Sequence, residues 1–218
     1  MKEILALTDI HFNLTNLRKI LENVKEFDLM LVAGDITNFG KGQEAREVIR
    51  ILSSKNKPFF FVPGNCDYAK EFPQDVNERN IHAKYVVIDN IAILGLGGST
   101  PTPFNTPFEL SEEMIDKILR ETYSNIKEKF EKFILVSHVP PYNTLIDTTK
   151  TGMHVGSRSV RKFIEQHNVD LVISGHVHEA RNIDRIGKTA LVNPGPANQG
   201  NYAKVTLNKE IEIKLERI

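Results

Sequence analysis

Short apolar runs alternate with longer amphipathic segments through the first third of the chain. Ile4–Thr8, Leu29–Ala33 and Phe59–Val62 are compact apolar runs, which are typical of strands buried on both faces. Between them, Asn13–Phe27 and Gln43–Ser54 carry apolar residues at intervals of three and four, which predicts two helices. A strand–helix–strand–helix–strand order predicts a parallel sheet with crossover helices.

The middle of the chain combines a hairpin with long loops and further helices. Tyr85–Asp89 and Ile91–Leu96 flank Asn90 and predict a β-hairpin. Ser111 is a suitable N-cap for a helix from Glu112 to about Phe130. The other elements that we expect here are strands Phe133–Ser137 and Leu171–Ser174, a helix Val155–His167, and loops Gly97–Phe108 and Val139–Gly152.

The C-terminal segment consists of short apolar runs separated by Gly or Asn. These runs are Arg181–Ile186, Ala190–Asn193, Tyr202–Leu207 and Glu210–Arg217. They predict an antiparallel C-terminal meander. Combined with the parallel units, the pattern predicts an α/β fold: a four-layer α-β-β-α sandwich of two mixed β-sheets flanked by helices. Because no linker interrupts the pattern, we expect residues 1–218 to form a single domain.

Composition supports a globular domain and argues against several other classes. Hydrophobic residues make up 40% and charged residues 26%, which is ordinary globular usage. Lys and Arg total 28 and Asp and Glu total 28, so general binding to nucleic acid is not expected. Cys66 is the single cysteine, and Asp9 interrupts the N-terminal apolar run, unlike in a signal peptide. No stretch approaches the ~20 apolar residues of a membrane span, so we expect a cytoplasmic protein without a membrane partner.

Five of the predicted strands are followed by side chains that can bind metal ions. The motifs are Asp9-Ile10-His11, Gly34-Asp35, Gly64-Asn65-Cys66-Asp67, His138 and Gly175-His176-Val177-His178. Ligands bind beyond the carboxyl ends of strands in α/β sheets, so we expect these side chains to form one cluster. In extended backbone, the side chains of residues two apart point to the same side. Asp9 and His11, and likewise His176 and His178, can therefore reach the same metal-binding region.

The residue types favour particular metals and one bridging residue. Imidazole mixed with oxygen ligands, without a thiolate cluster, favours Mn, Fe, Zn, Co or Ni over Ca or Mg alone. A carboxylate has two oxygens and can bridge two cations, and Asp35 is the candidate for this role. The alternative is that these residues are caps and satisfied polar groups, but their number and order favour a metal site.

Taken in this order, the motifs resemble those of the calcineurin-like metallophosphoesterase superfamily, especially its small microbial phosphoesterases. The resemblance runs from Asp9 to His178, with a similar Asn193-Pro194-Gly195 beyond. It implies two divalent cations, one held by Asp9, His11 and His178, and the other by Asn65, His138 and His176, with Asp35 between them. It also implies that a hydroxide between metals ~3.5–4 Å apart attacks phosphorus in line.

The chain departs from the family pattern at Cys66, where many members carry a histidine that assists the transition state or protonates the leaving group. Some small phosphodiesterase-like members share the Gly-Asn-Cys-Asp form, which favours a phosphodiesterase. We hypothesise that His154, in a loop before a predicted helix, supplies the proton or a phosphate contact. The alternative is that His154 is an ordinary loop residue. We expect Asp67 to form a turn or to orient a histidine rather than to bind a metal directly.

The resulting prediction is a metal-dependent hydrolase of a small phosphoester, favouring diesters and Mn²⁺. The alternatives are a phosphomonoesterase, including a protein phosphatase, and a non-catalytic metal-binding scaffold of the same fold. A nuclease is not favoured because the chain has no basic excess. We expect loops Gly97–Phe108 and Val139–Gly152 to border the site, and a homodimer is compatible with the sequence. The candidates for phosphate contacts are Arg158, Arg161 and Arg181.

Overall fold

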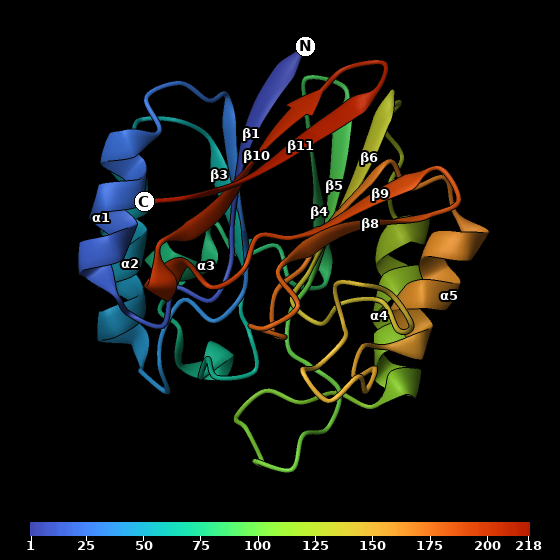
Figure 1. Ribbon diagram of the computed structural model, residues 1–218, viewed down its shortest axis with the longest axis horizontal. Helices are drawn as coiled ribbons and strands as arrows, with labels where there is room; N and C mark the ends of the chain where they lie inside the picture. Colours follow the sequence, from blue (N-terminus) through green and yellow to red (C-terminus); the bar gives the residue numbers. More distant parts are fainter.

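The computed structural model describes residues 1–218 and contains two β-sheets packed between two layers of helices (Figure 1). The first sheet has the order β11-β10-β1-β2-β3 and the second β4-β5-β6-β7-β9-β8. The strands of the first sheet are β1 (Lys2–Leu7), β2 (Leu29–Ala33), β3 (Phe59–Val62), β10 (Asn201–Leu207) and β11 (Ile211–Arg217). Those of the second are β4 (Lys84–Ile88), β5 (Ile91–Leu96), β6 (Lys132–Ser137), β7 (Leu171–Ile173), β8 (Asn182–Ile186) and β9 (Thr189–Asn193).

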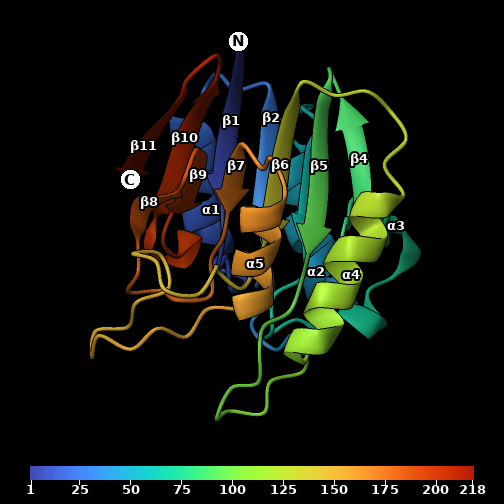
Figure 2. The ribbon, with the colours of Figure 1, turned by 90° about the vertical axis from the view of Figure 1, so that its right-hand side faces the viewer.

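The helices lie outside the two sheets, as the four-layer prediction required. They are α1 (Leu14–Asn23), α2 (Gly42–Ser53), α3 (Gln74–Asn77), α4 (Glu112–Ser124) and α5 (Arg158–Gln166), with 3-10 turns η1 (Ala69–Glu71) and η2 (Ala197–Gln199). Helices α1 and α2 cover the outer face of the first sheet, and α4 and α5 cover that of the second (Figures 1 and 2). None of these helices is both long enough and apolar enough to cross a membrane.

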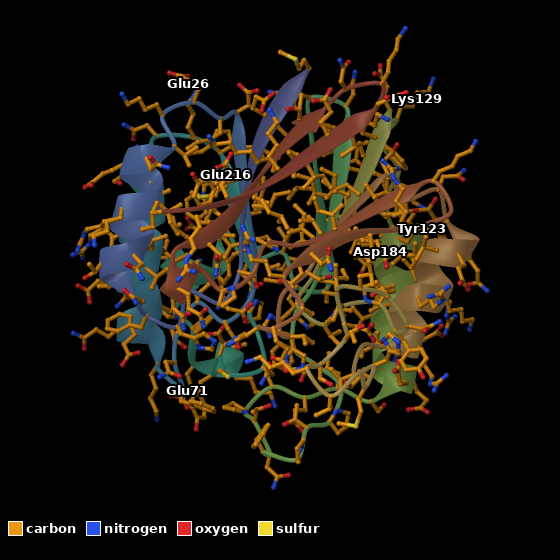
Figure 3. The ribbon with its side chains drawn as sticks, in the orientation of Figure 1. Glu26, Glu71, Tyr123, Lys129, Asp184 and Glu216 are labelled. Atoms are coloured by element: carbon orange, nitrogen blue, oxygen red, sulfur yellow. The ribbon has the colours of Figure 1, made fainter.

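Three apolar clusters fill the spaces between the four layers, because each strand presents alternate side chains to opposite faces. In β1, Leu5 and Leu7 pack under α1 and α2, whereas Ile4 and Ala6 face the second sheet. The third cluster lies between the second sheet and α4 and α5. Charged side chains such as the labelled Lys129 project from the outside of the molecule (Figure 3). The α-β-β-α sandwich of two mixed sheets is therefore confirmed.

The predicted C-terminal meander consists of two hairpins that belong to different sheets. Strands β8 and β9 pair antiparallel at the edge of the second sheet, where β9 also runs parallel to β7. Strands β10 and β11 pair antiparallel and join the first sheet beside β1. Between the hairpins, Ala197 N–H donates to Thr8 O at 2.8 Å and Asn198 N–H donates to Asp9 O at 3.1 Å. The crossover therefore packs against the loop that follows β1.

Three helices differ from their predicted bounds. Helix α1 ends at Asn23 rather than at Phe27, because the backbone of Val24 is extended. Helix α4 begins as predicted, with Ser111 Oγ accepting from Met114 N–H at 3.3 Å, but it ends at Ser124 rather than near Phe130. Phe130 still packs on the third apolar cluster, but it does so from the following loop. Helix α5 begins at Arg158 rather than Val155, because Glu112 of α4 accepts hydrogen bonds from Arg158 N–H and Ser159 N–H.

Candidate metal centre

All seven predicted metal-binding side chains lie on loops that follow the carboxyl ends of strands. Asp9 and His11 follow β1, Asp35 follows β2 and Asn65 follows β3, all in the first sheet. His138 follows β6, and His176 and His178 follow β7, in the second sheet. These strand ends point toward the lower side of Figure 1, so the two sheets contribute to one region.

The first group of side chains consists of Asp9, His11 and His178. His178 Nε2 lies 3.3 Å from Asp9 Oδ1, and His11 Nε2 lies 3.2 Å from His178 Nε2. Asp9 Oδ1 is buried and has no hydrogen-bond partner, and the same is true of His11 Nδ1. A buried carboxylate oxygen without a donor is costly, and two facing imidazole nitrogens cannot both accept. A bound cation would satisfy Asp9 Oδ1, His11 Nε2 and His178 Nε2 together, whereas His11 Nδ1 lies on the other side of its ring.

The second group consists of Asn65, His138 and His176. Asn65 Oδ1 lies 2.9 Å from His138 Nε2 and 2.8 Å from His176 Nδ1. His138 Nδ1 donates to Ala33 O at 2.7 Å, so in the neutral ring its Nε2 carries a lone pair. That lone pair faces the amide oxygen of Asn65, which is also an acceptor. Such an arrangement of converging acceptors fits a cation and would otherwise be repulsive.

Asp35 lies between the two groups. Its Oδ2 atom is 3.6 Å from His11 Nε2 and 3.6 Å from His138 Nε2, one from each group. Its other oxygen, Oδ1, accepts from Cys66 N–H at 2.8 Å, which fixes the orientation of the carboxylate. Asp35 Oδ2 therefore faces one imidazole of each group, and its role as a bridging ligand stays a prediction.

Burial and charge act differently on the two central carboxylates. Burial raises the pKa of Asp35 above its ordinary value, and the nearby Asp9 adds to this effect. Burial also opposes ionisation of Asp9, but the surrounding histidines, led by His178, hold the pKa of Asp9 below its ordinary value. Burial, together with His138, lowers the pKa of His176 to about 3, which keeps this imidazole neutral and able to bind a metal.

The backbone at four of these positions is left-handed rather than extended. The φ angles are 51° at Asp9, 43° at His11, 48° at Asp35 and 67° at His176. The expectation that Asp9 and His11 point the same way from extended backbone was therefore wrong, although their side chains do converge. Non-glycine residues with positive φ are uncommon and concentrate at functional sites, where the surrounding structure stabilises them.

Glycines before the ligands permit close approach of the loops. A Cβ atom at Gly34 would overlap His138 Nδ1, and one at Gly64 would overlap the Asp35 carboxylate. Gly34 also has a φ of 97°, which side-chain-bearing residues rarely adopt. The two glycines are therefore needed to bring Asp35 against the loops that carry Asn65 and His138.

Comparison with known proteins agrees with this arrangement. A family model described as calcineurin-like phosphoesterase matches residues 2–180. The chain belongs to the calcineurin-like phosphoesterase family. An uncharacterized protein of Methanocaldococcus jannaschii is 44% identical over 207 residues, covering 92% of this chain and 91% of that protein.

Two further relatives are more distant. The 3′,5′-cyclic adenosine monophosphate phosphodiesterase of Haemophilus influenzae is 24% identical over 188 residues, covering 84% of this chain and 66% of that protein. A crystal structure of a Thermus thermophilus protein superposes with a TM-score of 0.79 at 20% identity, covering 99% of this chain and 98% of the other. The structural likeness shows that the two proteins share a fold.

In this family member, the Asp67 carboxylate binds backbone N–H groups of neighbouring loops rather than a histidine. The fully buried carboxylate accepts from Ile36 N–H at 3.1 Å, Thr37 N–H at 2.8 Å and Gly64 N–H at 2.8 Å. It also accepts from the Thr37 hydroxyl at 2.7 Å. Of the two predicted alternatives, the structure shows the turn, in which Asp67 N–H donates to Gly64 O at 3.3 Å, and no hydrogen bond from the carboxylate to a histidine. Asp67 instead ties together the loops after β2 and β3, which carry Asp35 and Asn65.

His154 is paired with a buried carboxylate that the sequence did not single out. Its Nδ1 lies 2.7 Å from Asp147 Oδ1, and Asp147 is fully buried. Asp147 also accepts from Asn143 N–H, Thr144 N–H and Gly156 N–H, at 3.1, 2.8 and 3.0 Å. The His154 side chain remains 30% exposed. The pairing therefore fixes the ring through Nδ1 and leaves Nε2 as its free polar atom.

The three arginines considered for phosphate contacts are held by the protein itself. The Arg158 guanidinium stacks over the Tyr142 ring at 4.0 Å. Arg161 pairs with Glu165 and donates to two backbone carbonyls, and Arg181 donates to Pro194 O and Glu216 O. All three guanidinium groups therefore make contacts within the protein, and their role as phosphate contacts stays a prediction.

A polar cavity of about 400 Å³ opens beside His11 and His178. Neutral amide side chains line the rest of it, namely Asn13, Asn38, Asn198 and Gln199. Sequence reasoning missed these residues because isolated Asn and Gln residues carry no spacing signal. Asn198 follows the Asn193-Pro194-Gly195 motif, and this proximity was the one available indication. The cavity provides an uncharged polar route to the first ligand group.

Cys66 lies against the cluster but has the properties of a neutral thiol. Its Sγ is within 4.8 Å of ligand atoms of His11 and Asp35. Burial and the adjacent Asp35 carboxylate raise the pKa of the Cys66 thiol far above its ordinary value. A protonated thiol is a weak nucleophile, so the side chain fills space at the edge of the cluster.

Proposed function

We propose that this protein is a phosphodiesterase that uses two divalent cations, with Mn²⁺ as the expected metal. The observation that supports this most strongly is the position of Asp35 Oδ2, which is 3.6 Å from an imidazole nitrogen of each ligand group. Two bound cations would polarise the phosphoryl oxygens and lower the pKa of a water molecule. The proposal includes a small phosphoester substrate and a cytoplasmic setting.

The residues of the chain would contribute position and hydrogen bonding. The hydrogen bond from His138 Nδ1 to Ala33 O aims His138 Nε2 into the centre. The Cys66 N–H holds Asp35 Oδ1, and Asp67 holds the two loops on which Asp35 and Asn65 lie. This preorganisation reduces the reorganisation needed when substrate binds.

Two observations favour a diester over a monoester. A monoester carries up to two negative charges, whereas Arg158, Arg161 and Arg181 are all held in contacts with the protein. The open cavity beside the first ligand group offers neutral amides instead of fixed cations. The Haemophilus influenzae relative is named for hydrolysis of a phosphodiester, which also supports this proposal.

His154 would protonate the leaving oxygen in place of the histidine that many family members carry at the position of Cys66. Its Nδ1 is occupied by Asp147, so Nε2 is the atom that would exchange the proton. Proton donation of this kind increases the reaction rate by about 10²–10⁴-fold. Alkyl esters need this help more than nitrophenyl esters, because nitrophenolate leaves without protonation.

The test is turnover of bis(4-nitrophenyl) phosphate and 4-nitrophenyl phosphate before and after metal removal and after readdition of Mn²⁺. We expect metal-dependent hydrolysis with a higher kcat/KM for the diester, and a loss of at least about 10²-fold in Asp35→Asn. Asp75→Asn is the matched control, because Asp75 is an exposed aspartate paired with Arg46. Preference for the monoester would indicate a phosphomonoesterase. Bound metal without any turnover would favour a scaffold.

A further inference from the structure

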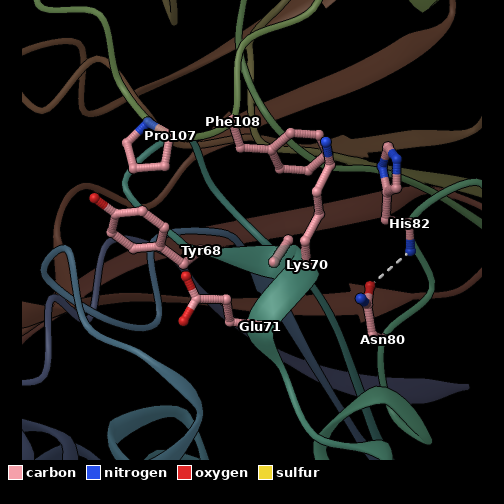
Figure 4. A pocket seen from close by; sticks show the side chains of 8 residues that line it. Tyr68, Lys70, Glu71, Asn80, His82, Pro107 and Phe108 are labelled. Carbon is pink, nitrogen blue, oxygen red and sulfur yellow. Dashed lines mark hydrogen bonds between the residues drawn. The ribbon is translucent and has the colours of Figure 1, made fainter.

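A second cavity, of about 380 Å³, is lined by residues from the segments 68–71, 80–82 and 107–108 (Figure 4). Its apolar lining comes from the rings of Tyr68, Pro107 and Phe108, and its polar lining includes Lys70 and His82. Figure 4 shows Tyr68 and Pro107 on one side of the cavity and His82 on the opposite side. We call this cavity the Tyr68–Phe108 pocket. None of its residues belongs to the ligand groups described above.

The Tyr68–Phe108 pocket is connected directly to the second ligand group. Phe108 N–H donates to the backbone oxygen of Asn65 at 3.1 Å. Tyr68 follows Asn65 by three residues, so their Cα atoms are at most about 11 Å apart. A substituent on a phosphoryl group bound near Asn65 can therefore reach the pocket.

Two hydrogen-bond donors in the pocket have no partner within the protein. His82 Nδ1 accepts from Gly97 N–H at 2.9 Å, so the ring hydrogen lies on Nε2, which makes no hydrogen bond. Burial lowers the pKa of His82 to about 4, so the ring stays neutral. Lys70 forms no ion pair, and the neighbouring Glu71 is paired with Lys41 at 3.2 Å.

We propose that the Tyr68–Phe108 pocket binds a nucleobase, which makes nucleotide phosphodiesters the substrate class. A planar ring can stack on Tyr68 and Phe108, since every base has an aromatic face. The carbonyl oxygens and ring nitrogens at the edge of a base are acceptors that match the donors of Lys70 and His82. An aliphatic substituent offers no acceptor to either donor. The assignment of nucleotide phosphodiesters as substrates rests on the proposed function. The assignment of a nucleobase to the pocket does not.

The kinetic test compares two diesters that release the same nitrophenolate: thymidine 5′-(4-nitrophenyl phosphate) and methyl 4-nitrophenyl phosphate. We expect the wild-type protein to prefer the thymidine ester in kcat/KM. Tyr68→Ala should reduce kcat/KM for this ester about tenfold, as expected for one lost stacking partner, and leave the methyl ester unchanged. Tyr68 is 37% exposed, so the variant is expected to fold, and Lys70→Ala provides a second variant with a severalfold loss.

The matched control is Phe104→Ala, which removes an aromatic ring from the same loop as Phe108 but outside the pocket. Phe104 is 81% exposed, and its removal should change neither ester. The inference is overturned if the wild-type protein shows no preference for the thymidine ester. It is also overturned if Tyr68→Ala and Lys70→Ala retain the full preference or affect both esters equally.

A binding measurement separates this inference from the proposed function. Adenosine and thymidine, which lack phosphate, are titrated into the Mn²⁺-treated protein and followed by saturation-transfer NMR. We expect saturable binding of at least one nucleoside, weakened in Tyr68→Ala and unchanged in Phe104→Ala. Binding without turnover of either ester would contradict the proposed phosphodiesterase but retain the nucleobase pocket. Absence of saturable binding of both nucleosides would overturn the pocket assignment.

Discussion

Two fully buried aspartates, Asp67 and Asp147, organise two different groups of loops. Asp67 accepts from three backbone N–H groups and the Thr37 hydroxyl. Asp147 also accepts from three backbone N–H groups, but its strongest additional contact is the imidazole of His154. All the donors around Asp67 are neutral and enclosed, whereas those around Asp147 include one partly exposed titratable ring.

This difference shows how one kind of hydrogen-bond network can serve two purposes. A carboxylate saturated by backbone donors rigidifies a loop, because each donor would otherwise be buried without a partner. Around Asp67, the result is a fixed frame for the side chains of Asp35 and Asn65. Around Asp147, the same kind of network also fixes the orientation of the His154 ring through its Nδ1 atom. We therefore expect the Asp67 network to affect metal binding and stability, and the Asp147 network to affect leaving-group chemistry.

Replacement of Asp67 should have the largest effect. Asp67→Ala leaves three backbone donors and one hydroxyl buried without partners, so we expect the free energy of unfolding to fall by roughly 3 kcal/mol or more. Weaker retention of metal should accompany this loss. Urea unfolding of the metal-free protein measures the first effect, with exposed Asp75→Ala as the control. A loss no greater than that of Asp75→Ala would show that Asp67 does not stabilise the loops.

Replacement of Asp147 should reduce both stability and turnover of alkyl diesters. Asp147→Ala removes the acceptor for three backbone N–H groups and for His154, so we expect a stability loss of roughly 2 kcal/mol. If Asp147 acts on catalysis through His154, adding Asp147→Ala to His154→Ala should produce no further loss of turnover. A double-mutant cycle on a methyl ester measures this coupling. Additive losses of turnover would contradict the positioning role.

Replacement of His154 should separate catalysis from stability. His154→Ala should change the free energy of unfolding little, because the ring is partly exposed. We expect turnover of an alkyl diester to fall about 10²-fold, while a nitrophenyl diester loses less than about threefold. The ratio of the two kcat/KM values is the measurement. An equal loss for both esters, or no loss for either, would reject His154 as the proton donor.

His82 offers a smaller effect that depends on pH. Its folded pKa of about 4 lies below the ordinary histidine value near 6.5, so the unfolded chain binds the proton more readily between these pH values. The wild-type stability should therefore fall as pH drops from about 6.5 to 4, by on the order of 2 kcal/mol from this group. Lys84 contributes to the shift, and the charged residues Lys70 and Glu71 line the same pocket.

The variant for this prediction is His82→Asn, which retains an acceptor for Gly97 N–H but does not titrate in this range. Urea unfolding at pH 7 and pH 4.5 should show a smaller loss for His82→Asn than for the wild-type protein. Equal losses would show that His82 is protonated as easily in the folded protein as in the unfolded chain.

The sequence predicted the sheets and the set of ligands because both follow local rules. Apolar runs such as Leu29–Ala33 define strands, and parallel strands deliver their following residues to one edge. The left-handed backbone at Asp9 and Asp35 was not predictable, because it depends on contacts from other loops, such as Asp9 N–H with Gly34 O at 3.0 Å. Local spacing contains no information about such contacts.

Long-range hydrogen bonds explain the other differences. Asp147 resembled any loop aspartate in sequence, and only folding brings its carboxylate to His154 and Gly156. The start of α5 was shifted because Glu112, far away in sequence, accepts from its first N–H groups. The Tyr68–Phe108 pocket combines residues from three separate segments, so no single motif contained it.

The central claim is that Asp35 bridges two metal ions, and Mn²⁺ binding with electron paramagnetic resonance tests it most directly. The account predicts two Mn²⁺ ions per wild-type chain, with a spectrum of a spin-coupled pair, as expected for ions about 3.5–4 Å apart. It also predicts loss of the coupled spectrum in Asp35→Asn but not in Asp75→Asn. A single ion per wild-type chain, or two ions whose spectrum shows no coupling, would contradict the bridged centre.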